Sequence, residues 1–417
     1  MTLTVTLQEG IAALEQGRFP DAESIFRQIL ENPDNLEQCA TMLLFALIWQ
    51  NKVDDVHALV EHSEHWQHYQ GALYDALMHY AKQNRFDVII TLSKQLEPRH
   101  VFLRAIIEFI TGCAKAGSGD TNLAAPHFQN AYSITHTCET PIPLAENLEH
   151  LIKAGWNIED DAFVAQVMGD KALNAKKAGL LIDHNILPTS GRPAGKEDFV
   201  IYSACDEKYL DAYVEAEVLS LDALGQARIF HLNIIGKSET CAGKVDAIRA
   251  RLKHVTLNYT IEQKPQPHST TYLACSRFVN ALSIMDMYDQ GLLISDVDIV
   301  FFEDVNRIAS FMQAHDVGCM FFENTLPWLR HIAAGVYVKN NPEGRNYLTA
   351  LGNYCLKKLE DHRYWTLDQT AMYCIANAFN RMGHKLSIFD LRAHGVHLYE
   401  IQPQMDARLV RNQTRFQ

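Results

Sequence analysis

The sequence predicts an all-helical repeat array at the N-terminus, followed by an α/β domain with a mostly parallel central sheet. In the first 140 residues, small or apolar positions that follow a turn recur in steps of 34, 33 and 35 residues. From residue 199 onward, short apolar segments alternate with segments of helical length, which is the pattern of a parallel sheet covered by helices. We therefore expect repeats at 1–140, a helical connector and linker at 141–198, and the α/β domain at 199–417.

The composition is that of an ordinary soluble globular protein, with 47% apolar and 21% charged residues. The net charge of −13 argues against a general nucleic-acid binder. The nine cysteines are scattered without a Cys-x-x-Cys pair, which predicts reduced thiols. The N-terminus lacks the pattern of a signal peptide, and no run approaches the roughly 18 apolar residues of a membrane span. We expect a cytoplasmic protein without a transmembrane segment.

The repeated positions of the N-terminal part are Ala22, Val56, Ile89 and Ala124. Each follows a turn with Gly or Asn, which can end a helix in the left-handed conformation. The repeated residue and the one four positions later then lie on one helix face and pack against the preceding helix. The alternative is an irregular helical domain that shares the spacing by chance.

The first unit, residues 10–35, resembles a tetratricopeptide repeat and includes Phe26 and Pro33. The later units diverge from that pattern, but their period of about 34 residues is the tetratricopeptide length. Such arrays bind through a concave face. The resemblance therefore implies a protein partner, or a protein acceptor held near a second domain.

The α/β part begins with an apolar strand that no glycine-rich phosphate loop follows, which disfavours a dinucleotide site or P-loop. In open α/β sheets, ligands bind beyond the carboxyl ends of the strands. The expected strands are 199–204, 228–235, 255–259, 291–302, 316–322 and 332–338, and the expected helices are 210–224, 243–253, 272–288, 342–359 and 368–378. Residues 144–187 are expected to be mostly helical and 188–198 to form a linker.

Two carboxylates interrupt the apolar run 291–302, at Asp296 and Asp298. We interpret this run as one buried strand, in which residues two apart point to the same side. Paired carboxylates in apolar surroundings are costly unless a cation neutralises them. A divalent cation with oxygen ligands is therefore predicted here.

This acidic pair at the fourth strand resembles the Asp-x-Asp motif of glycosyltransferases with the GT-A fold. Four further stretches have counterparts in the same order. They are Tyr202-Ser-Ala-Cys-Asp206 at the first strand, Arg277 on the preceding helix, Ala333-Ala-Gly-Val-Tyr-Val338, and Trp365-Thr-Leu-Asp-Gln369. The resemblance covers roughly residues 198–400 and is closest to the glycogenin and bacterial galactosyltransferase type. The chain departs from that type at Ala333, where Asn is usual, and lacks its terminal His-x-x-Gly-x-Lys-Pro-Trp segment.

The resemblance implies a metal-dependent transfer of sugar from a nucleotide-diphosphate sugar, with a UDP-sugar as the expected donor, to a hydroxyl on a protein or glycan. The implied catalytic residues are Asp368 and Gln369, with Asp368 as general base if the reaction inverts. The implied donor-binding residues are Ser203, Asp206, Tyr209, Arg277, Asp296 and Gly335. The implied Mn²⁺ or Mg²⁺ ligands are Asp296 and Asp298, with His394 or His397 as a third. Trp328, Arg330 and His331 could line an acceptor pocket, with ordinary loop packing as the alternative.

Several of these positions also have a simpler interpretation. Asp206 and Asp368 are placed to cap helices, and Arg277 to form a salt bridge on a helix surface. The acidic pair could be an acidic turn after a core strand. At the level of function, the rival is an adaptor that has lost catalysis and binds partners through the repeats. A nucleotidyltransferase ranks third, because Cys205-Asp206-Glu207 stands where such enzymes carry a glycine-rich, basic segment.

Overall fold

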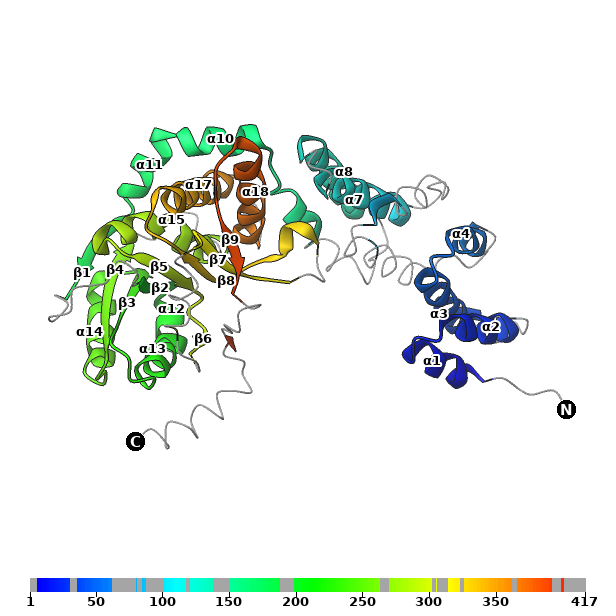
Figure 1. Cartoon of the computed structure of the whole chain (residues 1–417), viewed down its shortest axis with the longest axis horizontal. Coiled ribbons are helices and arrows are strands. Elements are labelled where there is room, and N and C mark those ends of the chain that lie inside the picture. Colours follow the sequence, from blue (N-terminus) through cyan, green and yellow to red (C-terminus); the bar gives the residue numbers. More distant parts are fainter. Residues whose placement is uncertain are drawn as a thin grey trace. The chain divides into compact units, whose positions relative to one another are not determined.

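The structure is a computed structural model that forms two compact units, Met1–Trp156 and Asn157–Gln417 (Figure 1). It describes residues 6–30, 36–61, 80, 85–87, 101–117, 121–137, 151–187, 199–262, 270–301, 305, 314–322, 326–361, 366–391 and 399–400.

The first unit is helical throughout the residues described. Its helices are α1 (Leu7–Glu15), α2 (Phe19–Leu30), α3 (Leu36–Trp49), α4 (Val53–Glu61), α7 (Val101–Gly117) and α8 (Thr121–Thr137). The expectation of an all-helical N-terminal part is confirmed.

Two helix pairs of this unit are packed in the same way. The ring of Phe26 lies so close to Gly10 that a Cβ there would be 2.5 Å from it, and Phe128 approaches Gly112 to 2.9 Å by the same measure. Gly17 has a φ of 71°, as expected for a left-handed helix end. Phe26 and Phe128, which lie four residues after Ala22 and Ala124, thus pack against the preceding helix. Assignment of the whole unit to a tetratricopeptide array stays a prediction, and Ile89 lies outside the described residues.

The second unit contains an eight-stranded sheet with the order β1-β4-β3-β2-β5-β8-β7-β9. Strands β2, β3, β4 and β5 are parallel to one another, β8 is antiparallel to β5 and β7, and β1 is antiparallel to β4. The strands are β1 (Leu181–Asn185), β2 (Phe199–Asp206), β3 (Arg228–Ile235), β4 (Val255–Glu262), β5 (Gly291–Ser295), β7 (Val317–Phe321), β8 (His331–Val338) and β9 (Ile388–Asp390). The predicted α/β domain with a mostly parallel sheet is confirmed.

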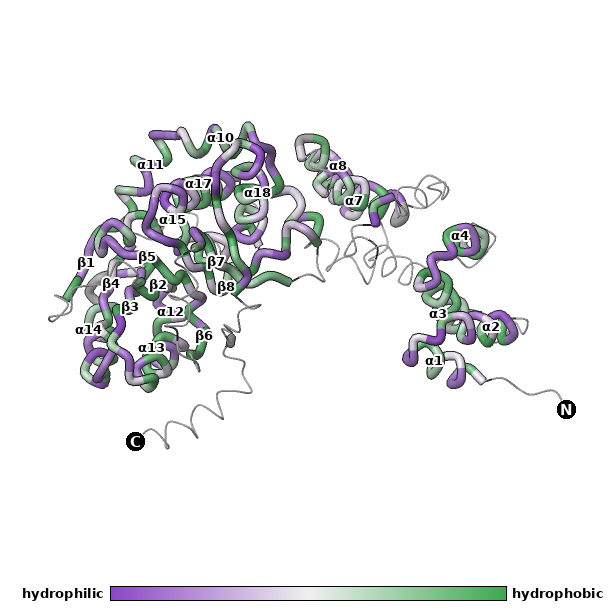
Figure 2. Tube along the Cα trace, in the orientation of Figure 1, coloured by the Kyte–Doolittle hydropathy of each residue, from purple (hydrophilic) through white to green (hydrophobic). Residues whose placement is uncertain are grey.

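Helices cover both faces of this sheet, and hydrophobic residues follow its central strands (Figure 2). On one face, α13 and α14 bury an apolar core against β2, β3 and β4. On the other, α15 lies against β2 and packs with α17. The helices are α10 (Asp161–Gly169), α11 (Lys171–Ala178), α12 (Glu207–Tyr209) with a π-helical turn (Leu210–Val214), α13 (Glu215–Asp222), α14 (Ser238–Arg249), α15 (Thr270–Tyr288), α17 (Pro342–Leu359) and α18 (Leu367–Met382).

The expected connector at 141–198 does not form a separate part beyond Trp156. Asn353 of α17 donates hydrogen bonds to the carbonyl of Val167, at 2.7 Å, and to the side chain of Asn174, at 3.0 Å. The chain then adds β1, an unpredicted strand, to the edge of the sheet. Its three central residues are exposed, so they show no apolar alternation that a sequence reading could detect.

The expected single strand at 291–302 is wrong. It is broken into β5 and β6 (Ile299–Val300), and β6 pairs with β10 (Tyr399–Glu400) in a separate two-stranded sheet. Asp296 and Asp298 therefore lie in a turn. In the part of the chain that the structure describes, no helix has both the length and the hydropathy needed to cross a bilayer.

Candidate active site at the carboxyl ends of β2 and β5

The order in which strands are added to the sheet reverses at β2. The chain adds β3 and β4 on one side of β2 and then crosses to place β5 on the other, and both neighbours are parallel to β2. At such a switch point the connecting helices diverge to opposite faces and leave a crevice at the carboxyl ends. Asp206 ends β2, and Asp296 follows the last residue of β5. These two residues mark the edge at which we locate the candidate site.

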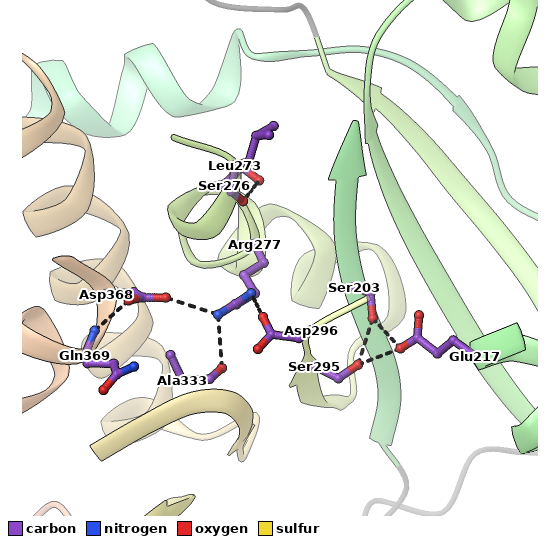
Figure 3. Close-up of polar contacts among 10 residues, drawn as sticks. All are labelled: Ser203, Glu217, Leu273, Ser276, Arg277, Ser295, Asp296, Ala333, Asp368 and Gln369. Atoms are coloured by element: carbon purple, nitrogen blue, oxygen red, sulfur yellow. Dashed lines mark hydrogen bonds and ion pairs between the residues drawn. The ribbon is translucent and has the colours of Figure 1, made fainter. Parts of the chain in front are cut away.

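Arg277 of α15 joins three distant segments at this edge (Figure 3). Its guanidinium donates to the carboxylate of Asp296, 19 residues away, and to Oδ2 of Asp368, 91 residues away, at 3.1 Å. It also donates to the carbonyl of Ala333 at 3.2 Å. The arginine is 6% exposed, so the alternative of a salt bridge on a helix surface is wrong.

Charges within this cluster shift its ionisation. Burial acts to lower the pKa of Arg277, but Asp296 and Asp368 outweigh it and raise that pKa above its ordinary value. Burial raises the pKa of Asp368, and the nearby Arg277 opposes this rise. A carboxylate with a raised pKa is a better proton acceptor than an ordinary one. The direction of the shift therefore suits the general-base role predicted for Asp368.

The turn that carries the acidic pair begins directly after β5. The amide of Asp296 donates to the carbonyl of Ala334 at 3.0 Å, which extends the pairing with β8 by one residue. Val297 is buried, whereas Asp296 and Asp298 are each partly exposed. The turn, and not the alternation of side chains along a strand, places the two carboxylates at the carboxyl edge of the sheet.

Ser203, expected to contact a donor, is fully buried. Residues alternate along β2, so Ser203 shares the face of Ile201 and Cys205, which α13 and α14 cover. Its hydroxyl donates to Glu217 of α13 at 2.9 Å. The side chain of Ser203 therefore points away from the edge, and its donor-binding role stays a prediction.

The other expected donor residues lie at or beside the edge. Asp206 accepts a hydrogen bond from the amide of Tyr209 at 2.9 Å, so it does cap a helix. Tyr209 is 37% exposed, and its pKa is raised by burial and then by the negative charge of Asp298. That influence places Tyr209 in the electrostatic field of the acidic turn. Gly335 is buried in β8 opposite Ser295 and flanks the turn through its backbone.

Asp368 and Gln369 lie in the first turn of α18. Asp368 is 4% exposed and accepts from the amide of Gln369 at 2.8 Å. The residue that precedes the helix is Thr366, so Asp368 does not occupy the capping position proposed as an alternative. Gln369 is partly exposed.

Of the three residues expected to line an acceptor pocket, only two are partly exposed. Trp328 is fully buried in a short 3₁₀ turn, Pro327–Leu329, so it cannot line a pocket in this conformation. Arg330 and His331 are partly exposed at the start of β8. Burial lowers the pKa of His331 to about 4, so this histidine is neutral at pH 7.

One residue beside the site was not predicted, the fully buried Glu217 of α13. It lies beneath the acidic turn and contacts both Ser203 and Ser295. Its helical spacing with Val214 and Leu221, both buried, was the signal in the sequence. A glutamate on the apolar stripe of an amphipathic helix points toward the core.

The two carboxylates of the turn could supply only part of a metal site. Among the residues that the structure describes, no group of three or more His, Cys, Asp or Glu side chains could hold a metal ion. His394 and His397, the predicted third ligands, lie outside these residues. Asp296 and Asp298 alone suit Mg²⁺-type binding, in which one or two carboxylates act together with substrate phosphates.

Comparisons with known proteins reveal distant likeness in structure only. No family model matches the sequence, and no curated protein matches it. The glycosyltransferase GlyE of Streptococcus pneumoniae TIGR4 is 14% identical with a TM-score of 0.34, covering 52% of this chain and 50% of that one. The bifunctional glycosyltransferase WbbM is 12% identical with a TM-score of 0.30, covering 44% and 38%. Mouse xyloside xylosyltransferase 1 is 12% identical with a TM-score of 0.32, covering 46% and 85%.

The chain thus spans about half or less of the first two of these structures. Likeness at these identities and TM-scores carries no argument about activity, which has to come from the site itself.

Proposed function

We propose that the second unit is a metal-dependent glycosyltransferase that moves a sugar from a nucleotide-diphosphate sugar, with UDP-sugar as the expected donor, to an acceptor hydroxyl. One observation carries this proposal: Arg277, Asp296 and Asp368 form a single ion-paired cluster. The cluster lies beside the switch point of the sheet, where open α/β sheets bind ligands. The GT-A resemblance of the sequence names the same three residues independently of their proximity in space.

Asp296 and Asp298 would hold Mn²⁺ or Mg²⁺. Two carboxylate ligands fit either ion when phosphates complete the coordination shell. Bound there, the ion would stabilise the negative charge of the departing diphosphate.

The chain's own residues have distinct tasks in this proposal. Arg277 orients Asp296 through a charge-assisted hydrogen bond and keeps Asp368 ionised. Asp368 accepts the proton of the acceptor hydroxyl if the reaction inverts. Gln369, next to it and partly exposed, positions the transferred sugar. Tyr209 offers an exposed ring at the same edge, suited to contact the nucleoside.

The helical first unit is proposed to bind a protein, either as a partner or as the acceptor, through tetratricopeptide-like repeats. A cytoplasmic location is proposed on the composition alone.

The experiment that tests this function compares Asp298→Asn with Asp246→Asn. Asp246 is a surface carboxylate on α14, paired with Arg249 and 63% exposed, and serves as the matched control. With UDP-, GDP- and CDP-sugars and Mn²⁺, we expect nucleotide release by the wild type and by the control. We expect a fall of about two to three orders of magnitude in Asp298→Asn, as when a group that stabilises transition-state charge is lost.

Unchanged turnover in a folded Asp298→Asn protein would overturn the proposed mechanism. If none of these nucleotide sugars with Mn²⁺ raises the melting temperature of the wild type, the adaptor alternative is favoured.

A further inference from the structure

Helix α13 is bonded to the chain on both sides of the turn that carries Asp296 and Asp298. Before the turn, Ser295 donates from its hydroxyl to the carboxyl group of Glu217 at 3.1 Å. After the turn, the amide of Phe301 donates to the hydroxyl of Ser220 at 3.0 Å. Glu217 and Ser220 are three residues apart, so they lie on one face of the helix.

The two attachments are linked to each other. The hydroxyl of Ser220 donates to the backbone carbonyl of Glu217 at 2.7 Å, which fixes its orientation and leaves its lone pairs for Phe301. Glu217 in turn contacts Ser203 of β2. The helix therefore holds β2, the end of β5 and the segment after the turn as one assembly.

Ser203, Ser295 and Glu217 form a closed triangle (Figure 3). The hydroxyls are 2.7 Å apart and lie 2.9 and 3.1 Å from Oε1 of Glu217. Two hydroxyl protons can serve only two of these three contacts. A neutral carboxyl group adds a third proton, so that the carboxyl group can donate to one hydroxyl while that hydroxyl donates to the other. Burial does raise the pKa of Glu217 well above its ordinary value.

Core packing does not explain why this position is a glutamate. Glu217 is fully buried, as are Val214, Val218 and Leu221 around it on the helix. Its Oε2 has no hydrogen-bond partner among the described residues. Replacement of such a group by an apolar side chain of similar volume is often neutral or stabilising. The contribution of the glutamate to the structure is therefore its hydrogen bonds to Ser203 and Ser295.

We propose that Glu217 and Ser220 are positioning residues of the active site, which hold the backbone on both sides of the Asp296–Asp298 turn and thereby set the separation of its two carboxylates. This inference rests on the proposed function. A cation held by these carboxylates would require its ligands at defined distances, and residues behind the ligands supply that order.

The test uses the full chain with Glu217→Gln, Glu217→Leu and Ser220→Ala, and Ser387→Ala as a control. Ser387 bonds to His315, away from the acidic turn. An amide at position 217 can both donate and accept within the triangle, whereas leucine keeps the volume and removes the bonds. We expect Mn²⁺ affinity in the presence of UDP, measured by calorimetry, to fall about 10- to 100-fold in Glu217→Leu and Ser220→Ala. Glu217→Gln and Ser387→Ala should bind within a few-fold of the wild type.

Hydrogen exchange of the amides from Asp296 to Phe301 supplies a readout that needs no metal or donor. These amides should exchange faster in Glu217→Leu and Ser220→Ala than in Glu217→Gln, at melting temperatures close to that of the wild type. Equal exchange in all variants, or unchanged Mn²⁺ affinity in Glu217→Leu, would overturn the positioning role. Failure of the wild type to bind Mn²⁺ with UDP, GDP or CDP would instead remove the proposed function, and the exchange result would then decide alone whether α13 holds the turn.

Discussion

Replacement of Arg277 by methionine should destabilise the second unit in a pH-dependent way. The change removes the guanidinium between Asp296 and Asp368 but keeps most of the side-chain volume. Asp368 is 4% exposed, so its charge would be buried without that partner. Loss of one partner of a buried ion pair typically costs about 3–5 kcal/mol.

The proton affinity of the carboxyl group limits this cost. A buried carboxylate can become neutral by taking up a proton. The free energy of that protonation is about 1.36 kcal/mol for each pH unit above an ordinary pKa of about 3.9. The limit is therefore about 4 kcal/mol at pH 7 and about 1.5 kcal/mol at pH 5. In the variant, the pKa of Asp368 in the folded state should lie further above its unfolded value. Stability is then lost as the pH rises, and the penalty should grow by about 3 kcal/mol from pH 5 to pH 7.

The assay is urea denaturation of the full chain at both pH values, followed by hydrogen exchange of β2 and β5, which reports on the second unit alone. The double variant Arg277→Met/Asp368→Asn should recover most of the loss at pH 7, because the unpaired carboxylate is gone. A penalty of equal size at the two pH values, or no recovery in the double variant, would refute charge compensation as the role of Arg277.

Two further predictions concern stability. Burial raises the pKa of Glu262 to about 7, so folding takes up a proton between about pH 4.5 and 7, and the free energy of unfolding should fall by about 3 kcal/mol as the pH rises through that window. Glu262→Gln should abolish this dependence, and an identical pH profile for both proteins would contradict it. Gly10→Ala should lower the thermal stability of the first unit by about 1–3 kcal/mol, because the new methyl group would lie 2.5 Å from Phe26, whereas Gly169→Ala, with nothing within 4 Å, should have little effect.

The sequence alone predicted those elements whose signals are local. The expected bounds of β3 and α17 agree with the structure, because an apolar strand pattern and an Asn341-Pro342 helix start depend on neighbouring residues only. The left-handed end at Gly17 is likewise a property of one turn. Features that depend only on neighbouring residues can be predicted from the sequence, and here they were enough to predict the fold class.

The candidate site was predicted in part. The resemblance to GT-A enzymes singled out Arg277, Asp296 and Asp368, which the structure brings together. It also singled out Ser203, which faces α13 because strand alternation, and not its place in a motif, decides its side. No sequence pattern predicted that Glu217 would contact Ser295, since that contact depends on where α13 lies relative to the end of β5.

What the sequence by itself determined is therefore the order of helices and strands, the apolar core and the residue types available for chemistry. Only the tertiary structure decided that the strand at 291–302 breaks at Asp296, because the break depends on pairing with β8 and β10 and on bonds to α13. It also decided that Arg277 is buried between two carboxylates and is not on a helix surface. Both outcomes depend on contacts between segments tens of residues apart, whose free energies no local pattern encodes.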